Sequence, residues 1–240
     1  MTTKIFDCIT FYNANMLFDL RYHSLKDHVD YFVICEASKT HTGQYKGYNF
    51  DKEFISKYGK KIIYIQVDDL PEIKIKGKKD YHLLKIQMEN LFRGIVKAED
   101  DDLIIFSDED EIPNPKMLPA FEQNNYKFGI FLQNMYYYKF NILGLDEGNG
   151  NWAGSRICKK KYLDSFFNFR ILKKKNISYP FWRVDKEKSI QLIANGGWHF
   201  TCIRTAEDLE KKLLNFAHHY EYEQSGLKIT DLKKLIKEKR

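Results

Sequence analysis

Short apolar runs alternate with stretches of helical spacing along the first half of the chain. Residues 15–28 and 80–98 place apolar side chains near helical spacing, which predicts two amphipathic helices. Shorter and more continuously apolar runs predict buried strands at residues 5–12, 31–37, 61–67 and 103–106. Buried strands separated by helices are typical of a mainly parallel sheet covered on both faces. The pattern therefore predicts an α/β fold with a Rossmann-like first half.

The second half of the chain is less regular. A long β-type run covers residues 127–141, and a glycine- and asparagine-rich stretch at 144–155 predicts a loop. Residues 188–203 end in a strand-like sequence, GGWHFTCI, and helices are predicted at 206–220 and 231–240. The chain has no internal repeat and no convincing linker, so we expect a single domain over residues 1–240.

The composition indicates a folded protein with a mild positive charge. Hydrophobic residues make up 43% and aromatic residues 15% of the chain, which is enough for a substantial core and argues against disorder. The net charge of +6 comes largely from lysines grouped at Lys159–Lys161, Lys173–Lys175 and residues 228–240. Such groups are solvated faces or are attracted to phosphates and anionic membranes. We expect no nucleic-acid partner, and a peripheral membrane contact is an open alternative.

The cysteines and the N-terminus favour a reducing compartment. The four cysteines lie far apart without metal-type spacing, so free thiols are expected at Cys8, Cys35, Cys158 and Cys202. No apolar segment of signal or anchor length precedes the first strand, which begins almost at once. We therefore expect a soluble cytoplasmic protein, in contact with a membrane only at its periphery.

Four consecutive acids follow the strand predicted at 103–106. Ligands of open parallel sheets bind outside the carboxyl ends of the strands, where Asp108–Glu111 would lie. Adjacent carboxylates repel one another, and a divalent cation removes that conflict. In an extended chain Asp108 and Asp110 share one side and Glu109 faces away, so the two aspartates can bind one Mg²⁺ or Mn²⁺ together with substrate phosphates.

Several readings of this acidic run remain open. It is either a solvated turn before Pro113 or the metal site of an enzyme. A haloacid-dehalogenase-type phosphatase would carry Thr or Val where Ile112 stands, and a calcium loop of EF-hand type would carry a central glycine. An Asp-x-Asp that holds a metal on a sugar nucleotide fits both position and spacing. A metal-dependent phosphohydrolase or nucleotidyltransferase stays as the alternative.

Three further residues are candidates for the same site. His199 follows two glycines that allow close approach to a ligand, and it could complete the metal shell or be a strand histidine beside Trp198. Arg21, on the first predicted helix, could bind a diphosphate or form a surface salt bridge. Glu36 ends the second predicted strand, where it would contact a nucleoside or act only as a cap.

Five stretches of the chain resemble glycosyltransferase family 17 in sequence, order and spacing: residues 19–43, 62–71, 101–115, 195–200 and 215–221. The resemblance implies a GT-A fold and inverting, β-1,4-type transfer of N-acetylglucosamine from UDP-N-acetylglucosamine to a glycan or glycolipid acceptor. It also implies a divalent metal, Mn²⁺ or Mg²⁺. By the motif match, Asp108 and Asp110 bind metal and diphosphate, Asp110 takes part in catalysis, and Glu111 belongs to the same box.

The resemblance divides the expected domain into three parts. Residues 1–115 would bind the nucleotide, residues 116–221 would form the acceptor side, and residues 222–240 would be a C-terminal helix. Inverting transfer needs a general base, for which Asp146 and Glu147 in the glycine-rich loop are candidates, although the loop could be an ordinary polar one. His218 matches a family box and could otherwise lie on a helix face.

One stretch departs from the family pattern. Where the family has an acidic, N-E-x-D-L-L-like sequence before the first helix, this chain has Ala14 and Met16. A non-catalytic carbohydrate-binding descendant of the family is therefore a third hypothesis.

Overall fold

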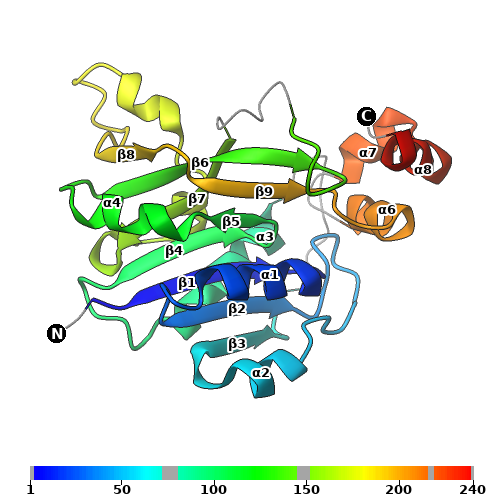
Figure 1. Cartoon of the computed structure of the whole chain (residues 1–240), viewed down its shortest axis with the longest axis horizontal. Helices are drawn as coiled ribbons and strands as arrows, with labels where there is room; N and C mark the ends of the chain where they lie inside the picture. Colours follow the sequence, from blue (N-terminus) through cyan, green and yellow to red (C-terminus); the bar gives the residue numbers. More distant parts are fainter. Residues whose placement is uncertain (1–2, 72–80, 145–151, 216–218, 239–240) are drawn as a thin grey trace.

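The computed structural model describes residues 3–71, 81–144, 152–215 and 219–238. Its described strands belong to one sheet with the order β3-β2-β1-β4-β7-β6-β9-β5, and β8 pairs with β6 (Figure 1). The strands are β1 (Ile5–Phe11), β2 (Tyr31–Ala37), β3 (Ile62–Val67), β4 (Leu103–Asp108), β5 (Glu111–Pro113), β6 (Phe128–Tyr137), β7 (Trp152–Lys159), β8 (Ile190–Ile193) and β9 (Gly197–Thr201).

The sheet is parallel in its first half and mixed in its second. Strands β3, β2, β1 and β4 run parallel to one another, whereas β7 is antiparallel to both β4 and β6. Strand β6 is parallel to β8 and β9, and β5 is antiparallel to β9. Parallel pairs outnumber antiparallel ones, so the predicted Rossmann-like fold with a mainly parallel sheet is confirmed.

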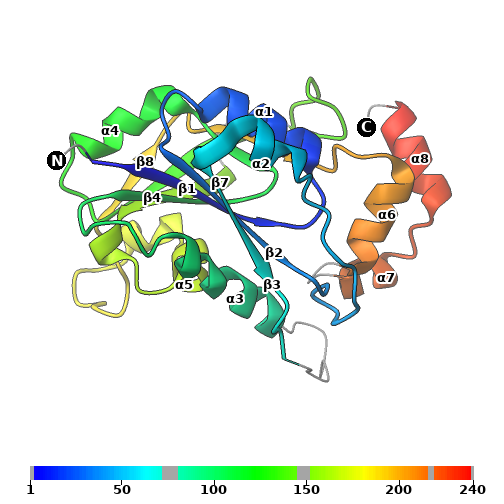
Figure 2. The ribbon, with the colours of Figure 1, turned by 90° about the horizontal axis from the view of Figure 1, so that it is seen from below.

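Helices cover both faces of the sheet. Figure 2 shows α1, α2 and α4 on one side and α3 and α5 on the other, while α6, α7 and α8 stand together at one end of the molecule. The α-helices are α1 (Asn15–Leu25), α2 (Glu53–Tyr58), α3 (His82–Glu89), α4 (Leu118–Glu122), α5 (Phe166–Arg170), α6 (Ala206–Asn215), α7 (His219–Ser225) and α8 (Ile229–Glu238). Short 3-10 helices are η1 (Gly59–Lys61), η2 (Asn90–Gly94), η3 (Pro115–Met117), η4 (Lys160–Tyr162) and η5 (Lys174–Ser178).

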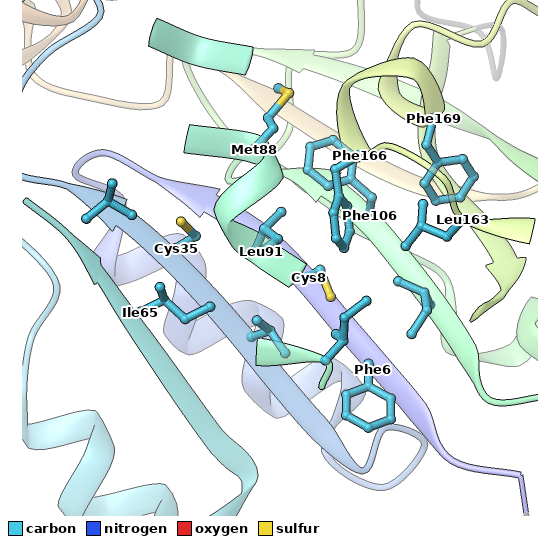
Figure 3. Close-up of a cluster of buried hydrophobic side chains, with 14 of the residues drawn as sticks. Phe6, Cys8, Cys35, Ile65, Met88, Leu91, Phe106, Leu163, Phe166 and Phe169 are labelled. Carbon is cyan, nitrogen blue, oxygen red and sulfur yellow. The ribbon is translucent and has the colours of Figure 1, made fainter. Parts of the chain in front are cut away.

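Successive residues of each central strand supply different cores. On β1, Phe6 and Cys8 face α3, η2 and α5, and Figure 3 shows them packed with Leu91 and Phe106. The next residue, Ile9, faces the opposite core beneath α1 and α2. This two-residue alternation explains why the strands read as continuously apolar, since both faces are buried.

Three predicted segments differ from the structure. The helix expected over 80–98 is α3 followed by η2 and ends at Gly94, where an added Cβ would lie 2.3 Å from Cγ1 of Val33. Within residues 188–203 the predicted strand GGWHFTCI is confirmed as β9, and β8 before it was not predicted. The predicted loop 144–155 already belongs to β7 from Trp152 onward, and residues 145–151 lie outside the described part.

The cysteines agree with the expectation of free thiols. Cys8, Cys35 and Cys158 are fully buried, and Cys202 is partly exposed. Burial raises the pKa of the Cys35 thiol to about 12, which keeps it unreactive at neutral pH. Within the described ranges, we find no helix with the length and apolar character needed to span a bilayer.

The two glycines before Trp198 are explained by contacts between strands. A Cβ on Gly196 would lie 2.6 Å from the backbone nitrogen of Leu132, and one on Gly197 would lie 2.2 Å from the carbonyl oxygen of Ile112. Gly197 also has a φ of +122°. The glycines therefore let β9 approach β6 and β5, and the expected close approach to a ligand stays a prediction.

We expect Gly197→Ala to lower the free energy of unfolding by about 3 kcal/mol or more, because the methyl group meets backbone that cannot rotate away. Gly59→Ala is the matched control: its φ is +63°, but nothing lies within 4 Å of an added Cβ. The control should cost only about 1–2 kcal/mol. Urea unfolding of the two variants measures the difference, and equal losses would contradict the close approach.

Candidate functional site

A cavity of about 360 Å³ opens at the carboxyl ends of β1, β2 and β4. Its lining includes Thr10 from β1, Thr40 after β2 and the acids Asp108, Glu109 and Asp110. Strand β1 is paired in parallel with both β2 and β4, so the carboxyl ends of these three strands lie at the same edge of the sheet. The acidic run lies at the carboxyl end of its strand, as the sequence predicted.

The acids lie at a tight reversal of the chain between β4 and β5. We call this reversal the acid hairpin, although β4 and β5 pair with other strands and not with each other. Strand β4 ends at Asp108, the chain turns at Glu109 and Asp110, and β5 begins at Glu111. The expectation of an extended run was wrong, because Glu111 pairs with His199 of β9 and this pairing requires the chain to reverse. Because the chain turns here, the side chains of the neighbouring acids point toward different partners.

Asp108 is bound by an arginine from α5. Its Oδ1 accepts from Arg170 Nε at 3.2 Å and its Oδ2 from Arg170 Nη2 at 2.6 Å. The Asp108 side chain keeps 28% of its surface exposed, so it remains accessible from the cavity. Arg170 also lines the cavity and brings a fixed positive charge to it.

Asp110 is almost buried between a lysine and a histidine. Its Oδ2 accepts from Lys212 Nζ at 3.0 Å, and its Oδ1 lies 3.5 Å from His199 Nε2. Burial by itself would raise the pKa of Asp110, but the charges of Lys212 and His199 outweigh burial and hold that pKa well below its usual range. Asp110 is therefore a carboxylate at every physiological pH.

The surroundings of His199 favour its doubly protonated, positively charged form. Burial by itself would lower its pKa, but the hydrogen bond and charge of Asp110 raise the pKa above its ordinary value. Its Nδ1 is buried with no hydrogen-bond partner among the described residues, and its ring lies 4.8 Å from that of Trp152. A metal ligand must be a neutral imidazole, so the predicted ligand role of His199 would require loss of that proton.

The other two acids of the hairpin are held by protein groups. Glu109 accepts from the backbone nitrogens of Tyr12 and Asn13 at 2.9 and 3.2 Å and from Arg204 at 2.7 Å. Glu111 is only 1% exposed and accepts from Trp152 Nε1 at 2.8 Å. Burial, followed by the charge of Asp108, raises the pKa of Glu111. These two side chains fix the hairpin in place.

Glu36 lies outside the cavity lining and organises the loop after β2. Its Oε1 accepts from Lys46 Nζ at 2.6 Å and from the backbone nitrogen of Asn49 at 2.7 Å. Its Oε2 accepts from the backbone nitrogen of Phe50 at 3.0 Å and from Tyr64 at 2.8 Å. With four donors and no exposed surface, Glu36 acts on the site by positioning residues 38–50.

Several cavity residues were not predicted from the sequence. Gln87 and His41 meet at 3.0 Å between Gln87 Oε1 and His41 Nε2, and Gln87 also donates to the carbonyl of Cys35 at 3.1 Å. The cations of the lining are Lys39, Lys46, Arg170 and Lys212. Lys39 and Lys46 follow a predicted strand end, a signal that could have found them. Arg170 and Lys212 come from distant helices and had no such signal.

Three candidate residues are not described by the structure, and two further ones lie at the start of α1. Asp146, Glu147 and His218 are outside the described residues. Ala14 precedes α1 and is buried, whereas Met16 is 55% exposed.

The chain matches the profile described as glycosyltransferase family 17 over residues 1–236. It belongs to this family. The family assignment makes the chain a glycosyltransferase that takes a sugar donor and an acceptor, and it confirms the resemblance of the five sequence stretches.

The other comparisons add little to the family assignment. A crystal structure of 4-diphosphocytidyl-2C-methyl-D-erythritol synthase is similar over 67% of this chain and 77% of that chain, with 11% identity and a TM-score of 0.39. At that TM-score the likeness carries no argument. Comparison with proteins of curated function gave no match.

The described side chains at this site could hold a divalent ion only together with ligands that do not come from the protein. Among the described residues, no three His, Cys, Asp or Glu side chains are gathered around one point. Asp108 and Asp110 nevertheless open onto the same cavity as carboxylates. Mg²⁺ and Mn²⁺ are commonly held by one or two carboxylates while substrate phosphates and water complete the shell, and two such groups are present here.

Beneath the acid hairpin lies a fully buried ion pair. Arg21 of α1 is 0% exposed and binds both carboxylate oxygens of Asp7 in β1. It also donates to Ser107 of β4 at 2.9 Å and to the backbone carbonyl of Glu111. Arg21, predicted to bind a diphosphate or to lie at the surface, is instead buried and joins α1, β1, β4 and β5 under the site.

We expect Asp7→Ala to lower the free energy of unfolding by about 3–5 kcal/mol, because Arg21 would keep its charge without a partner. Asp69→Ala breaks an exposed pair with Arg93 of 3.1 Å and serves as the control, with a loss below about 1 kcal/mol. Urea unfolding measures both. An Asp7→Ala protein as stable as the control would show that the buried pair does not hold the hairpin.

Proposed function

We propose that this chain is a metal-dependent, inverting N-acetylglucosaminyltransferase that uses UDP-N-acetylglucosamine and acts on a glycan or glycolipid. The observation that carries the proposal is one cavity that joins three carboxylates with four cationic side chains at the carboxyl edge of a Rossmann-like sheet. Family membership supports sugar transfer, and the cavity supports a nucleotide diphosphate as the donor part.

The lining of the cavity contains side chains suited to a diphosphate and others suited to a base. Lys39, Lys46, Arg170 and Lys212 present positive charge, which stabilises bound phosphates and the charge that grows on a departing UDP. Leu84 and Met88 add apolar surface beside the hydrogen-bonded pair His41 and Gln87. An apolar wall with a few fixed polar groups is suited to a nucleobase such as uracil.

Asp108 and Asp110 are the residues that would hold Mn²⁺ or Mg²⁺ against the diphosphate. When bound, the ion would supply positive charge to the diphosphate oxygens. Arg170 and Lys212 now occupy the cation positions beside these carboxylates, so they would share the carboxylates with the ion or move onto the phosphates. In this proposal the side chains Glu36 and Glu111 act by positioning, and His199 is a ligand or the partner of Asp110.

The transfer step needs a base on the acceptor side. The base removes the proton of the acceptor hydroxyl while its oxygen forms a bond to C1 of the sugar, and the bond from C1 to UDP breaks. We retain Asp146 and Glu147 as candidates for this role. Residues 1–115 would then bind most of the nucleotide, with Arg170 and Lys212 contributed by the acceptor side at residues 116–221. The segment 222–240, expected to be one helix, contains the end of α7 and then α8.

Binding of UDP-N-acetylglucosamine should depend on both the metal and Asp110. We expect Mn²⁺ to strengthen donor binding, and Asp110→Asn to weaken it about tenfold or more in Mn²⁺, since a neutral amide is a poorer ligand for a hard ion. Titration calorimetry with and without Mn²⁺ measures both effects. Glu122→Gln, an exposed acid on α4, is the control that should bind as the unaltered protein does.

Three outcomes would reject parts of this proposal. Donor affinity that ignores both Mn²⁺ and Asp110→Asn would remove the acid hairpin from the donor site. Metal-dependent binding without any slow release of UDP would instead favour the carbohydrate-binding descendant that Ala14 and Met16 suggest. Hydrolysis of simple phosphate esters in place of sugar transfer would favour a phosphohydrolase.

A further inference from the structure

An apolar tip projects from the segment between α5 and β8. Phe181 is 85% exposed, Trp182 is 66% exposed and Val184 is 91% exposed. Figures 1 and 2 show this yellow segment extending from the sheet at the end opposite α6–α8. Single exposed apolar residues are ordinary, but three within four positions form a patch that water solvates poorly.

Positive charge surrounds this tip. Residues 171–188 contain six basic and two acidic side chains. Both acids are already paired, Asp185 with Arg183 and Lys186, and Glu187 with Lys127. A groove of about 730 Å³ runs along the base of the segment, and its lining lysines are Lys127, Lys161, Lys173, Lys175 and Lys186.

The exposed tip is held in shape by its own hydrogen bonds. The backbone nitrogen of Val184 donates to the carbonyl of Trp182 at 2.9 Å. Lys188 Nζ donates to the carbonyls of Phe181 and Arg183 at 3.2 and 2.8 Å. A preformed tip loses little conformational entropy when it is buried, so its exposure is suited to docking.

We propose that residues 171–188 dock this protein onto an anionic membrane surface. Aromatic side chains favour the interface between headgroups and acyl chains, and lysines near it are attracted to anionic lipids. Phe181, Trp182 and Val184 would enter the interface while Lys173 and Lys175 meet the headgroups. Neither of these two lysines forms an ion pair with a residue in the described ranges, so both charges are available.

The proposal selects one of the basic regions of the chain. Lys161, Lys173 and Lys175 line the same groove, whereas α8, which carries Lys233, Lys234 and Lys237, stands at the other end of the molecule (Figure 1). Ile171 lines both this groove and the cavity that contains Asp108. The docking segment therefore begins beside the candidate site, while its exposed tip lies at the end of the molecule opposite α6. Docking does not depend on the proposed activity, and vesicles alone can test it.

The test measures binding of the whole chain to phosphatidylcholine vesicles with and without phosphatidylglycerol, by sedimentation and tryptophan fluorescence. We expect binding to the anionic vesicles that weakens with added salt, with a blue shift of emission and quenching by brominated lipid. Trp182→Phe should remove the quenching while Trp152 and Trp198 remain. Equal binding to neutral vesicles, or no binding to either, would overturn the proposal.

Matched variants distinguish vesicle binding through the tip from non-specific adsorption of the protein. Val184→Asp should weaken partition to anionic vesicles about tenfold, whereas Val96→Asp, at a similarly exposed valine (77%), should leave it unchanged. Lys173→Glu with Lys175→Glu should weaken partition about tenfold or more, and Lys234→Glu with Lys237→Glu on α8 should have little effect. Equal effects of variant and control overturn the proposal. The proposal would also be overturned if a tip variant abolished self-association, measured by light scattering, while its binding to vesicles persisted.

Discussion

The buried contact between Arg21 and Asp7 is the interaction on which the rest of the site depends. One guanidinium binds a carboxylate of β1, a hydroxyl of β4 and a backbone carbonyl of β5, so a single side chain fixes three strands and the helix that carries it. A buried charge is tolerated only when its hydrogen bonds are satisfied, and this pair satisfies them within a dry core. The acid hairpin can therefore leave β4 and return as β5 at a fixed place above it.

The charges of the acids are balanced locally at the carboxyl edge of the sheet. Each acid of the hairpin meets a different group, with Asp108 on Arg170, Glu109 on Arg204, Asp110 on Lys212 and Glu111 on Trp152. Repulsion between neighbouring carboxylates is offset by cations of the protein itself.

The two ends of the molecule differ in what they present. One end carries the helices α6 to α8, and α6 supplies Lys212 to the candidate site. The other end carries the exposed tip around Trp182 with its lysines. Lys212 at the first end is used inside the fold, whereas Lys173 and Lys175 near the tip are exposed. Similar lysine-rich sequences thus have different physical roles according to what packs beside them.

The sequence by itself determined strands β1 to β4, the presence of α1 and α3, and the position of the acids after β4, whereas α2 was not predicted. Those features follow from local periodicity, because burial on both faces of a strand or on one face of a helix repeats within a few residues. Only the tertiary structure decided the partners of the charges. Asp110 meets Lys212, which is 102 positions away, and the acidic run turns because Glu111 pairs with His199. No local pattern encodes such contacts, since they depend on which distant segments the completed sheet brings together.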